Sequence, residues 1–224
     1  MSRAPSLVVP TAPTPPGYRV AKRSLDLATS VIGLIVASPI LALVAIAVKL
    51  ESRGPVLFRQ ERLGLGGRPF TLYKFRSMFS SAEQGRHRDY VRELIRGGAA
   101  NVVPSDEVWL PIAADPRVTR LGAFLRRSHL DELPQLINIV RGEMSLVGPR
   151  PPIPYEVEVY EPWHLRRLSV VPGLTGLWQA TAWGRVSFDE GVVLDLAYID
   201  RRSFGLDLRL VGRTLWQIVI GRQF

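Results

Sequence analysis

A run of 22 residues without a charged side chain, Leu27–Val48, constrains this chain more than any other feature of its sequence. About 20 apolar residues are enough for a helix to cross the hydrocarbon core of a bilayer. The alternative is a buried helix of a soluble protein, which so long an uncharged stretch disfavours. The segment therefore predicts a membrane helix, and the remaining question is whether that helix crosses the bilayer.

Two features favour a helix that dips into the membrane and returns. Ser38-Pro39 stands at its midpoint, where proline removes a helical hydrogen bond and kinks or breaks the helix. The Ser38 hydroxyl is expected to bond to a carbonyl freed by the proline. Because basic residues flank both ends, the positive-inside rule places both ends on the cytoplasmic side. A re-entrant helix is thus favoured over a kinked span; the flanking residues are Lys22 and Arg23 before the segment and Lys49, Arg53, Arg59 and Arg62 after it.

The amino-acid composition limits the kinds of site and partner that this protein can have. The 224 residues include no cysteine, which excludes disulfides, cysteine-ligated metals and a thiol nucleophile. The formal net charge of +9 predicts an anionic partner, namely nucleic acid, an anionic membrane surface or a phosphorylated substrate. Arginine outnumbers lysine, and its planar fork suits phosphate, although codon bias explains the excess equally well.

We expect three segments: a disordered proline-rich tail over residues 1–18, the re-entrant helix over 19–53, and one domain over 54–224. The predicted fold class is α+β and mostly helical, with interfacial helices around a small β-hairpin. The hairpin comprises Pro55–Arg59 and Pro69–Arg76 around a turn at Gly64–Gly67. The patterns predict helices over Ser80–Arg96, Val118–Arg127, Leu130–Val140, Tyr155–Leu168 (interrupted at Pro162), Ser187–Arg202 and Leu206–Ile220, with rigid loops at Gly148–Pro154 and Pro172–Gly176.

Few residues qualify as catalysts. The three histidines have no metal-ligand spacing, and no phosphate loop or dinucleotide fingerprint occurs. What remains is the pair Asp131-Glu132 at the predicted start of a helix. These carboxylates either stabilise the helix dipole or bind Mg²⁺ and attack phosphorus. The prolines beside Arg150 restrict its backbone and would aim its guanidinium, which suits holding a phosphate.

The run LRRSHLDELPQLINIVRGEMSLVGPRP (residues 125–151) resembles the monotopic phosphoglycosyl transferases, bacterial sugar transferases that load a phosphosugar onto a polyprenyl phosphate. They include undecaprenyl-phosphate galactose and glucose phosphotransferases. The resemblance extends from about residue 20 to the C-terminus through KRSLD, Ser38-Pro39, GPVLFRQERLG, LYKFRSM, DPRVTRLG and PGLTGLWQ. The Ser-Pro match strengthens the re-entrant interpretation.

This resemblance implies transfer of sugar-1-phosphate from a UDP-sugar to undecaprenyl phosphate, with release of UMP and with Mg²⁺ as cofactor. Asp131 would be the nucleophile that forms a covalent phosphosugar intermediate, and Glu132 would assist it with Mg²⁺ binding or proton handling. Phosphate and nucleotide contacts would come from Lys74, Arg76, Arg150 and an acid of the penultimate helix, Asp195 or, as second choice, Asp200. The enzyme would work on the cytoplasmic face of the bacterial inner membrane, in the first membrane step of exopolysaccharide, O-antigen or glycoconjugate synthesis.

Two other classes of protein could share this charge and this apolar segment. A membrane-tethered nucleic-acid-binding module would explain the charge, but the arginines are spread along the chain and no such module is recognisable, so we expect no nucleic-acid partner. A non-catalytic membrane scaffold would not need Asp131. The sequence leaves open the sugar, a homodimer, and whether Gln84–Leu110 is a lid, a dimer contact or a substrate selector.

Overall fold

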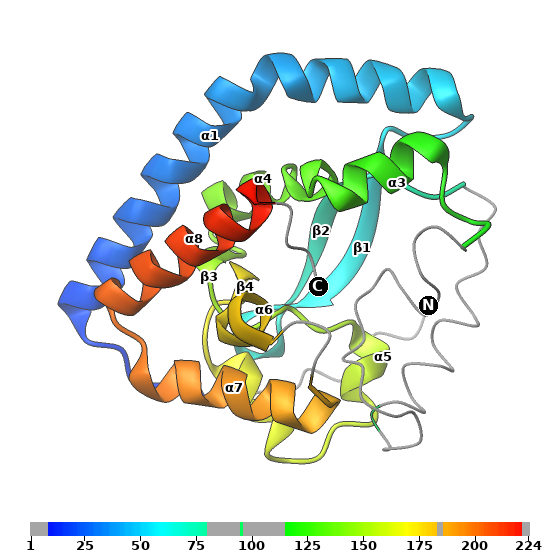
Figure 1. The fold of residues 1–224 in the computed structure, drawn as a ribbon. Coiled ribbons are helices and arrows are strands. Elements are labelled where there is room, and N and C mark those ends of the chain that lie inside the picture. The colour runs from blue at the N-terminus through cyan, green and yellow to red at the C-terminus, as the bar shows by residue number, and fades with distance from the viewer. Residues whose placement is uncertain (1–8, 80–94, 96–114, 183–185, 221–224) are drawn as a thin grey trace.

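The computed structural model describes residues 9–79, 95, 115–182 and 186–220, and its architecture is the mostly helical α+β fold that the sequence predicts (Figure 1). The helices are α1 (Pro16–Glu51), α3 (Arg120–Arg127), α4 (Gln135–Arg141), α5 (Pro154–Val157), α6 (Leu177–Ala182), α7 (Phe188–Arg201) and α8 (Phe204–Val219). The strands are β1 (Leu57–Leu63), β2 (Pro69–Phe75), β3 (Ser145–Val147) and β4 (Gly173–Thr175), and the 3₁₀ turns are η1 (Leu65–Gly67), η2 (Leu130–Glu132) and η3 (His164–Ser169).

Helix α1 runs unbroken through Pro39 for 36 residues and bends along its length as it arches over the domain (Figure 1). Proline cannot donate to the carbonyl four residues earlier, which here belongs to Ile35. The Ser38 hydroxyl donates to this carbonyl at 2.8 Å, as the sequence predicts. The Ser-Pro pair therefore marks a position inside one continuous helix and does not separate two helices.

The basic residues before the apolar segment face the domain. Arg23 donates to the carbonyls of Ile139 and Val140, at the end of α4, at 2.6 and 2.8 Å. Lys22 donates to the Val147 carbonyl at 2.9 Å and to buried Asp207 at 3.0 Å. These two charges, expected to mark the membrane surface, instead fasten the first half of α1.

The end of α1 is fastened to the same domain. Its Glu51 carboxylate accepts from the Leu121 amide of α3 at 2.8 Å. Val44 and Val48 pack with Phe75 of β2 and Leu125 of α3. Both ends of the apolar helix are thus held by one body of protein.

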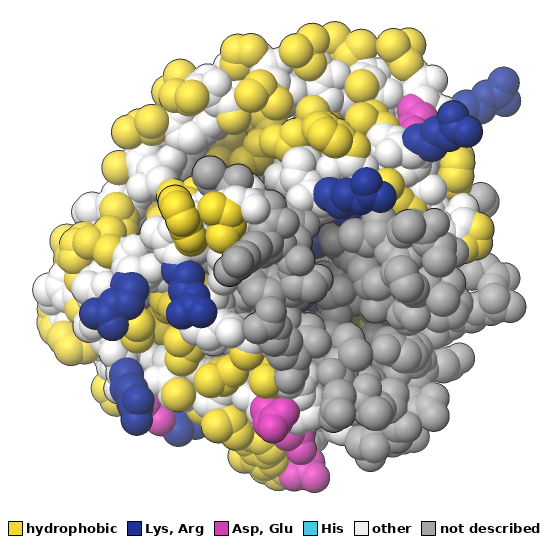
Figure 2. Space-filling model, viewed as in Figure 1, with side chains coloured by type: hydrophobic (Ala, Val, Ile, Leu, Met, Phe, Trp, Pro, Cys, Tyr) yellow, Lys and Arg dark blue, Asp and Glu magenta, His cyan; other side chains and the backbone are white. Residues whose placement is uncertain are grey.

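The outer face of α1 stays apolar and exposed, and Figure 2 shows hydrophobic side chains along this arch. Helix α8 has both buried and exposed apolar residues. Leu210 is buried in the main core, whereas Leu215 and Trp216 are largely exposed. The exposed large apolar residues of α1 are Val20, Leu27, Val31, Ile32, Ile35, Val36, Ile40, Leu43, Ile46 and Leu50.

The predicted hairpin is confirmed, since β1 and β2 pair antiparallel from Leu57–Phe75 to Leu63–Pro69. A second pair was not expected: β3 and β4 are parallel, so part of the predicted turn Pro172–Gly176 is a strand. A Cβ on Gly173 would lie 2.0 Å from the Gly148 nitrogen, so glycine is required there. Strands of three residues carry too little pattern to be seen in a sequence.

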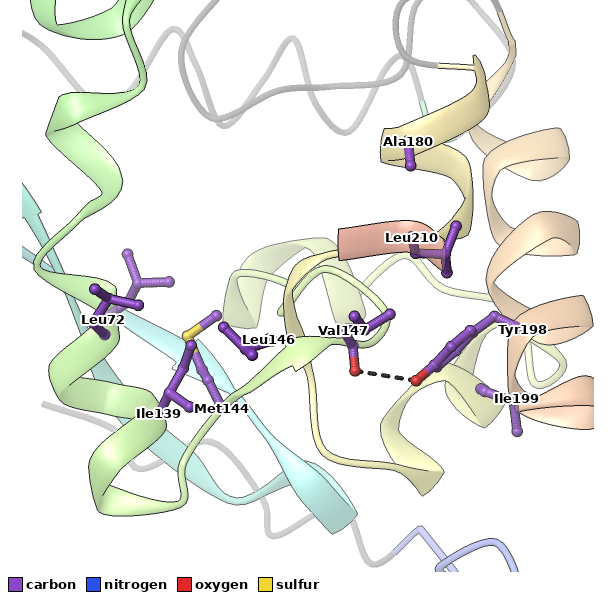
Figure 3. Close-up of a cluster of buried hydrophobic side chains, with 10 residues drawn as sticks. Leu72, Ile139, Met144, Leu146, Val147, Ala180, Tyr198, Ile199 and Leu210 are labelled. Atoms are coloured by element: carbon purple, nitrogen blue, oxygen red, sulfur yellow. Dashed lines mark hydrogen bonds between the residues drawn. The ribbon is translucent and has the colours of Figure 1, made fainter. Parts of the chain in front are cut away.

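The main core joins these elements (Figure 3). Ile139 and Met144 pack beside β3, and Tyr198 of α7 donates a hydrogen bond to the Val147 carbonyl at 3.1 Å. The other buried members are Leu72, Leu136, Leu146, Ala180, Ile199 and Leu210.

Two expectations differ from the structure. Residues 9–18 of the predicted tail are held on the domain: the Ala12 amide donates to the Ser169 carbonyl at 2.8 Å, and Pro16 already begins α1. The predicted helix Leu130–Val140 is divided into η2 and α4 by Pro134, which lacks a backbone donor. Tyr155–Leu168 is divided as Pro162 suggested. Residues 1–8, Ser80–Arg96 except residue 95, and most of Gln84–Leu110 lie outside the described residues.

Candidate active site

The acidic pair occupies the 3₁₀ turn η2, between α3 and α4. His129 precedes it with a φ of 54°, a left-handed conformation that turns the chain sharply out of α3. The Asp131 side chain is only 1% exposed. A carboxylate at such a site is shielded from bulk water, so neighbouring charges act on it strongly.

Lys74 links the acidic pair to the hairpin. It lies on β2 and is 5% exposed, and its Nζ atom is 3.0 Å from the Glu132 carboxylate. An amine on a strand interior is rarely buried without a partner. The pairing brings together two residues that the sequence predicted for the site, from elements 58 positions apart.

A small pocket opens beside this pair. Arg62 of β1, Lys74 of β2 and Arg150 of the proline-rich loop all line it, so three cationic residues from different elements meet there. Such a recess suits an anionic group such as a phosphate. Its lining residues are Arg62, Leu72, Lys74, Gln135, Arg150, Pro151, Gly173 and Leu174.

The loop that carries Arg150 is held through its carbonyl groups. Pro149, Pro151 and Pro152 have no N–H, so their backbone can only accept hydrogen bonds. Four consecutive carbonyls do so, and their donors come from β1, η3 and β4. These bonds are Gly173 amide to Pro149 at 2.9 Å, Arg167 to Arg150 at 3.4 Å, Arg62 to Pro151 at 2.7 Å, and Leu63 amide to Pro152 at 2.9 Å.

Arg76 is placed differently from the other predicted cations. Its guanidinium donates to the carbonyls of Val48, Ser52 and Arg53 at 3.0, 2.7 and 2.9 Å. A cation on the last carbonyls of a helix stabilises that helix end. Arg76 therefore has a structural role at the C-terminus of α1, and direct phosphate binding by it stays a prediction.

Asp195 lies inside α7 and is fully buried. One carboxylate oxygen accepts a hydrogen bond from Arg167 Nε at 2.8 Å and forms an ion pair with Arg167 Nη2, also at 2.8 Å. Burial raises the pKa of Asp195 to about 6, against the opposing effect of Arg167. Asp195 does not line the pocket, and the second choice, Asp200, is exposed and pairs with Arg166.

Sequence reasoning missed three residues of this region. Arg62 was taken as a flanking membrane charge, yet it is 1% exposed and holds the proline-rich loop. Gln135 lines the pocket, and Arg167 connects Asp195 to the loop. A buried arginine looks like a surface arginine in a sequence, so no local pattern could have identified them.

Comparison with known proteins identifies the family of this chain. The model of the family described as bacterial sugar transferase matches residues 17–221, so the chain belongs to that family. It is 39% identical over 205 residues to galactosyl transferase CpsE of Streptococcus agalactiae, which covers 91% of this chain and 43% of that protein. It is 38% identical over 221 residues to UDP-glucose:undecaprenyl-phosphate glucose-1-phosphate transferase of Escherichia coli, over 94% of this chain and 43% of that one.

A shorter relative is matched almost throughout. The chain is 36% identical over 206 residues to the exopolysaccharide production protein ExoY of Sinorhizobium fredii, covering 91% of this chain and 87% of ExoY. The chain thus spans less than half the length of the streptococcal and Escherichia coli relatives.

Proposed function

We propose that this protein transfers sugar-1-phosphate from a UDP-sugar to undecaprenyl phosphate and releases UMP. The observation that carries the proposal is the turn with buried Asp131 and half-buried Glu132, because Lys74, the partner of Glu132, lines a pocket together with Arg150. The family and the names of its relatives point to the same type of transfer. Production of a surface polysaccharide is the corresponding role.

In the first half-reaction, an Asp131 carboxylate oxygen attacks the phosphorus that bears the sugar. A bond forms between this oxygen and phosphorus, the diphosphate bridge breaks, and UMP leaves with its electron pair. In the second half-reaction, a phosphate oxygen of undecaprenyl phosphate attacks the same phosphorus and frees Asp131. Lys74 and Arg150 offset the charge of the diphosphate during both steps.

The donor set suits Mg²⁺. Among the described residues no cluster of three metal-binding side chains occurs, and Asp131 and Glu132 are adjacent carboxylates. Magnesium commonly binds proteins through one or two carboxylates and completes its shell with substrate phosphates and water. When bound, the ion would stabilise charge on the leaving phosphate. Lys74 holds the Glu132 carboxylate through an ion pair at 3.0 Å.

We further propose that α1 enters and leaves the cytoplasmic leaflet of the inner membrane without crossing it. Its hydropathy and length would allow a span. Its two ends, however, are fastened to the same domain, by Arg23 at one end and Glu51 at the other. If α1 crossed the membrane, its two ends would lie on opposite sides, and one of these two contacts with the domain would be lost. The re-entrant path keeps the candidate active site at the surface where lipid phosphates lie.

The test is UMP release from a panel of UDP-sugars, with Mg²⁺ and undecaprenyl phosphate in detergent or lipid nanodiscs. We expect turnover with at least one sugar, ping-pong kinetics, and protein labelling by a UDP-sugar that carries ³²P in its β-phosphate. Asp131→Asn should abolish labelling while the protein remains folded. No turnover with any sugar would refute the transfer, and a ternary-complex pattern without labelled protein would refute the covalent step.

A further inference from the structure

Arg167 occupies an unusual position for a charged residue. It lies in η3 and is buried, and its guanidinium reaches three groups on different parts of the chain. It donates to the Asp195 carboxylate at 2.8 Å, to the Tyr160 hydroxyl at 2.8 Å and to the Arg150 carbonyl at 3.4 Å. Its planar fork can make these bonds at once, which an ammonium group cannot reproduce.

Stability is a weak explanation for this cluster. Removing an arginine and an aspartate from water is energetically costly, and apolar side chains of similar volume often stabilise a protein as well or better. The Asp195 side chain is fully buried, and one of its oxygens has no hydrogen-bond partner among the described residues. The cluster therefore calls for a role other than packing.

The contact between Arg167 and the Arg150 loop indicates such a role. Arg150 is the pocket residue of the loop, and its own carbonyl is the group that Arg167 holds. The flanking prolines have no backbone N–H, so the loop around Arg150 depends on the hydrogen bonds that its carbonyls accept. The bond from Arg167 is the one that holds the carbonyl of Arg150 itself, so its loss would loosen the backbone at the residue whose side chain lines the pocket.

We propose that Arg167, braced by Asp195 and Tyr160, is a positioning residue that aims Arg150 at the diphosphate of the nucleotide sugar. This inference rests on the function proposed above. Arg167 and Asp195 do not line the pocket, so they act through the loop and not by contact with substrate. A small displacement of a phosphate-binding group is enough to lower the efficiency of a transfer reaction by an order of magnitude or more.

The experiment is a double-mutant cycle between Arg167 and Arg150, followed by steady-state UMP release as a function of UDP-sugar concentration. Arg167→Lys retains the charge beside Asp195 and loses the fork. Arg150→Ala removes the pocket cation. The matched control is Arg166→Lys. Arg166 is next to Arg167 in the sequence and pairs at the protein surface with Asp200, which lies on α7 as Asp195 does.

We expect Arg167→Lys to raise KM for the UDP-sugar about tenfold with kcat changed less than about threefold, since the lost interaction serves binding. In the Arg150→Ala background the same substitution should change KM less than about twofold, because the two residues act as one unit. Arg166→Lys should leave both constants unchanged. Equal effects of Arg167→Lys in the two backgrounds would overturn the inference.

Tyr160→Phe provides a second variant in case Arg167→Lys does not fold. It removes only the hydroxyl that receives one Arg167 bond, and thermal unfolding measured in parallel reports on the fold. We expect a smaller rise in KM, about threefold, that again disappears in the Arg150→Ala background. An unchanged KM in folded Tyr160→Phe would overturn the inference. If the unmodified protein released no UMP from any UDP-sugar, the proposed function would fail first and the inference with it.

Discussion

At the scale of single residues, the candidate site depends on Lys74. Its amine is 3.0 Å from Glu132, and it shares the pocket with Arg150. Lys74→Met should lower UMP release by about 100-fold, since removal of one preorganised charge at a reacting phosphate commonly costs that much. Lys74→Arg should retain part of the activity. The measurement is initial rate together with thermal unfolding.

Arg68→Met is the control for charge alone, because Arg68 is an exposed cation of the β1–β2 connection. It should keep the full rate. If Lys74→Met retained wild-type activity, Lys74 would have only a structural part in the hairpin.

The burial of the Asp195 carboxylate predicts how the stability of the protein depends on pH. Burial raises its pKa from about 3.8 to about 6, although Arg167 acts in the opposite direction. The folded protein therefore binds this proton more tightly than the unfolded chain between about pH 4 and pH 6. The free energy of unfolding due to this group should decrease as pH rises through that window and then level off.

Chemical denaturation of the wild type and of Asp195→Asn at several pH values measures this effect. The stability difference between the two proteins should change between pH 4 and 6 and stay constant above about pH 7. Asp200→Asn, at an exposed position of α7, is the control and should show no such change. A pH-independent difference for Asp195→Asn would contradict the prediction.

At the scale of elements, the β3–β4 pair is the junction that carries the proline-rich loop. A Cβ on Gly173 would lie 2.0 Å from the Gly148 nitrogen and 2.4 Å from the Thr175 carbonyl oxygen, both backbone atoms that cannot move away easily. Gly173→Ala should lower the free energy of unfolding by about 3 kcal/mol or more, as a clash in a packed interior does.

Gly212→Ala is the matched control within α8, where an added Cβ meets nothing within 4 Å. It should stabilise the protein by about 0.5–1 kcal/mol through helix propensity. Thermal and denaturant unfolding test both variants. A tolerated alanine at position 173 would mean that the parallel pair is looser than the structure indicates.

The elements also show why parts of the fold were predictable. The hairpin has seven-residue strands and a glycine-rich turn, so alternation and turn chemistry identify it locally. The pair β3–β4 depends on three-residue strands 28 positions apart in register, from Ser145 to Gly173. Nothing in either segment alone indicates its partner.

At the scale of the whole molecule, the re-entrant path of α1 is open to a direct test because the chain has no native cysteine. Single cysteines in place of Gly17 and Arg53 mark the two ends of the helix, and the Gly17 position has open space around it. A membrane-impermeant maleimide should label both variants from the cytoplasmic side only, in inside-out vesicles and not in intact spheroplasts.

Leu43→Cys, at an exposed apolar position in the second half of α1, serves as the buried reference and should resist the reagent from either side until detergent is added. Labelling of the two ends from opposite sides of the membrane would show that α1 spans it. Ready labelling of Leu43→Cys without detergent would show that the apolar face is not in lipid.

The sequence by itself determined the family, the mostly helical class, the long apolar helix with its Ser38–Ile35 bond, and the residues on which the chemistry is proposed to depend. These are local properties: runs without charge, the geometry of proline, and motifs whose residues lie close together along the chain. Only the tertiary structure decided which charges face outward and which face the protein. Lys22, Arg23 and Arg62 turn inward, Arg76 caps α1, and Arg167 joins Asp195 to the Arg150 loop. The reason is physical: a charge is buried only where partners from distant segments meet it, and those partners are brought together by folding.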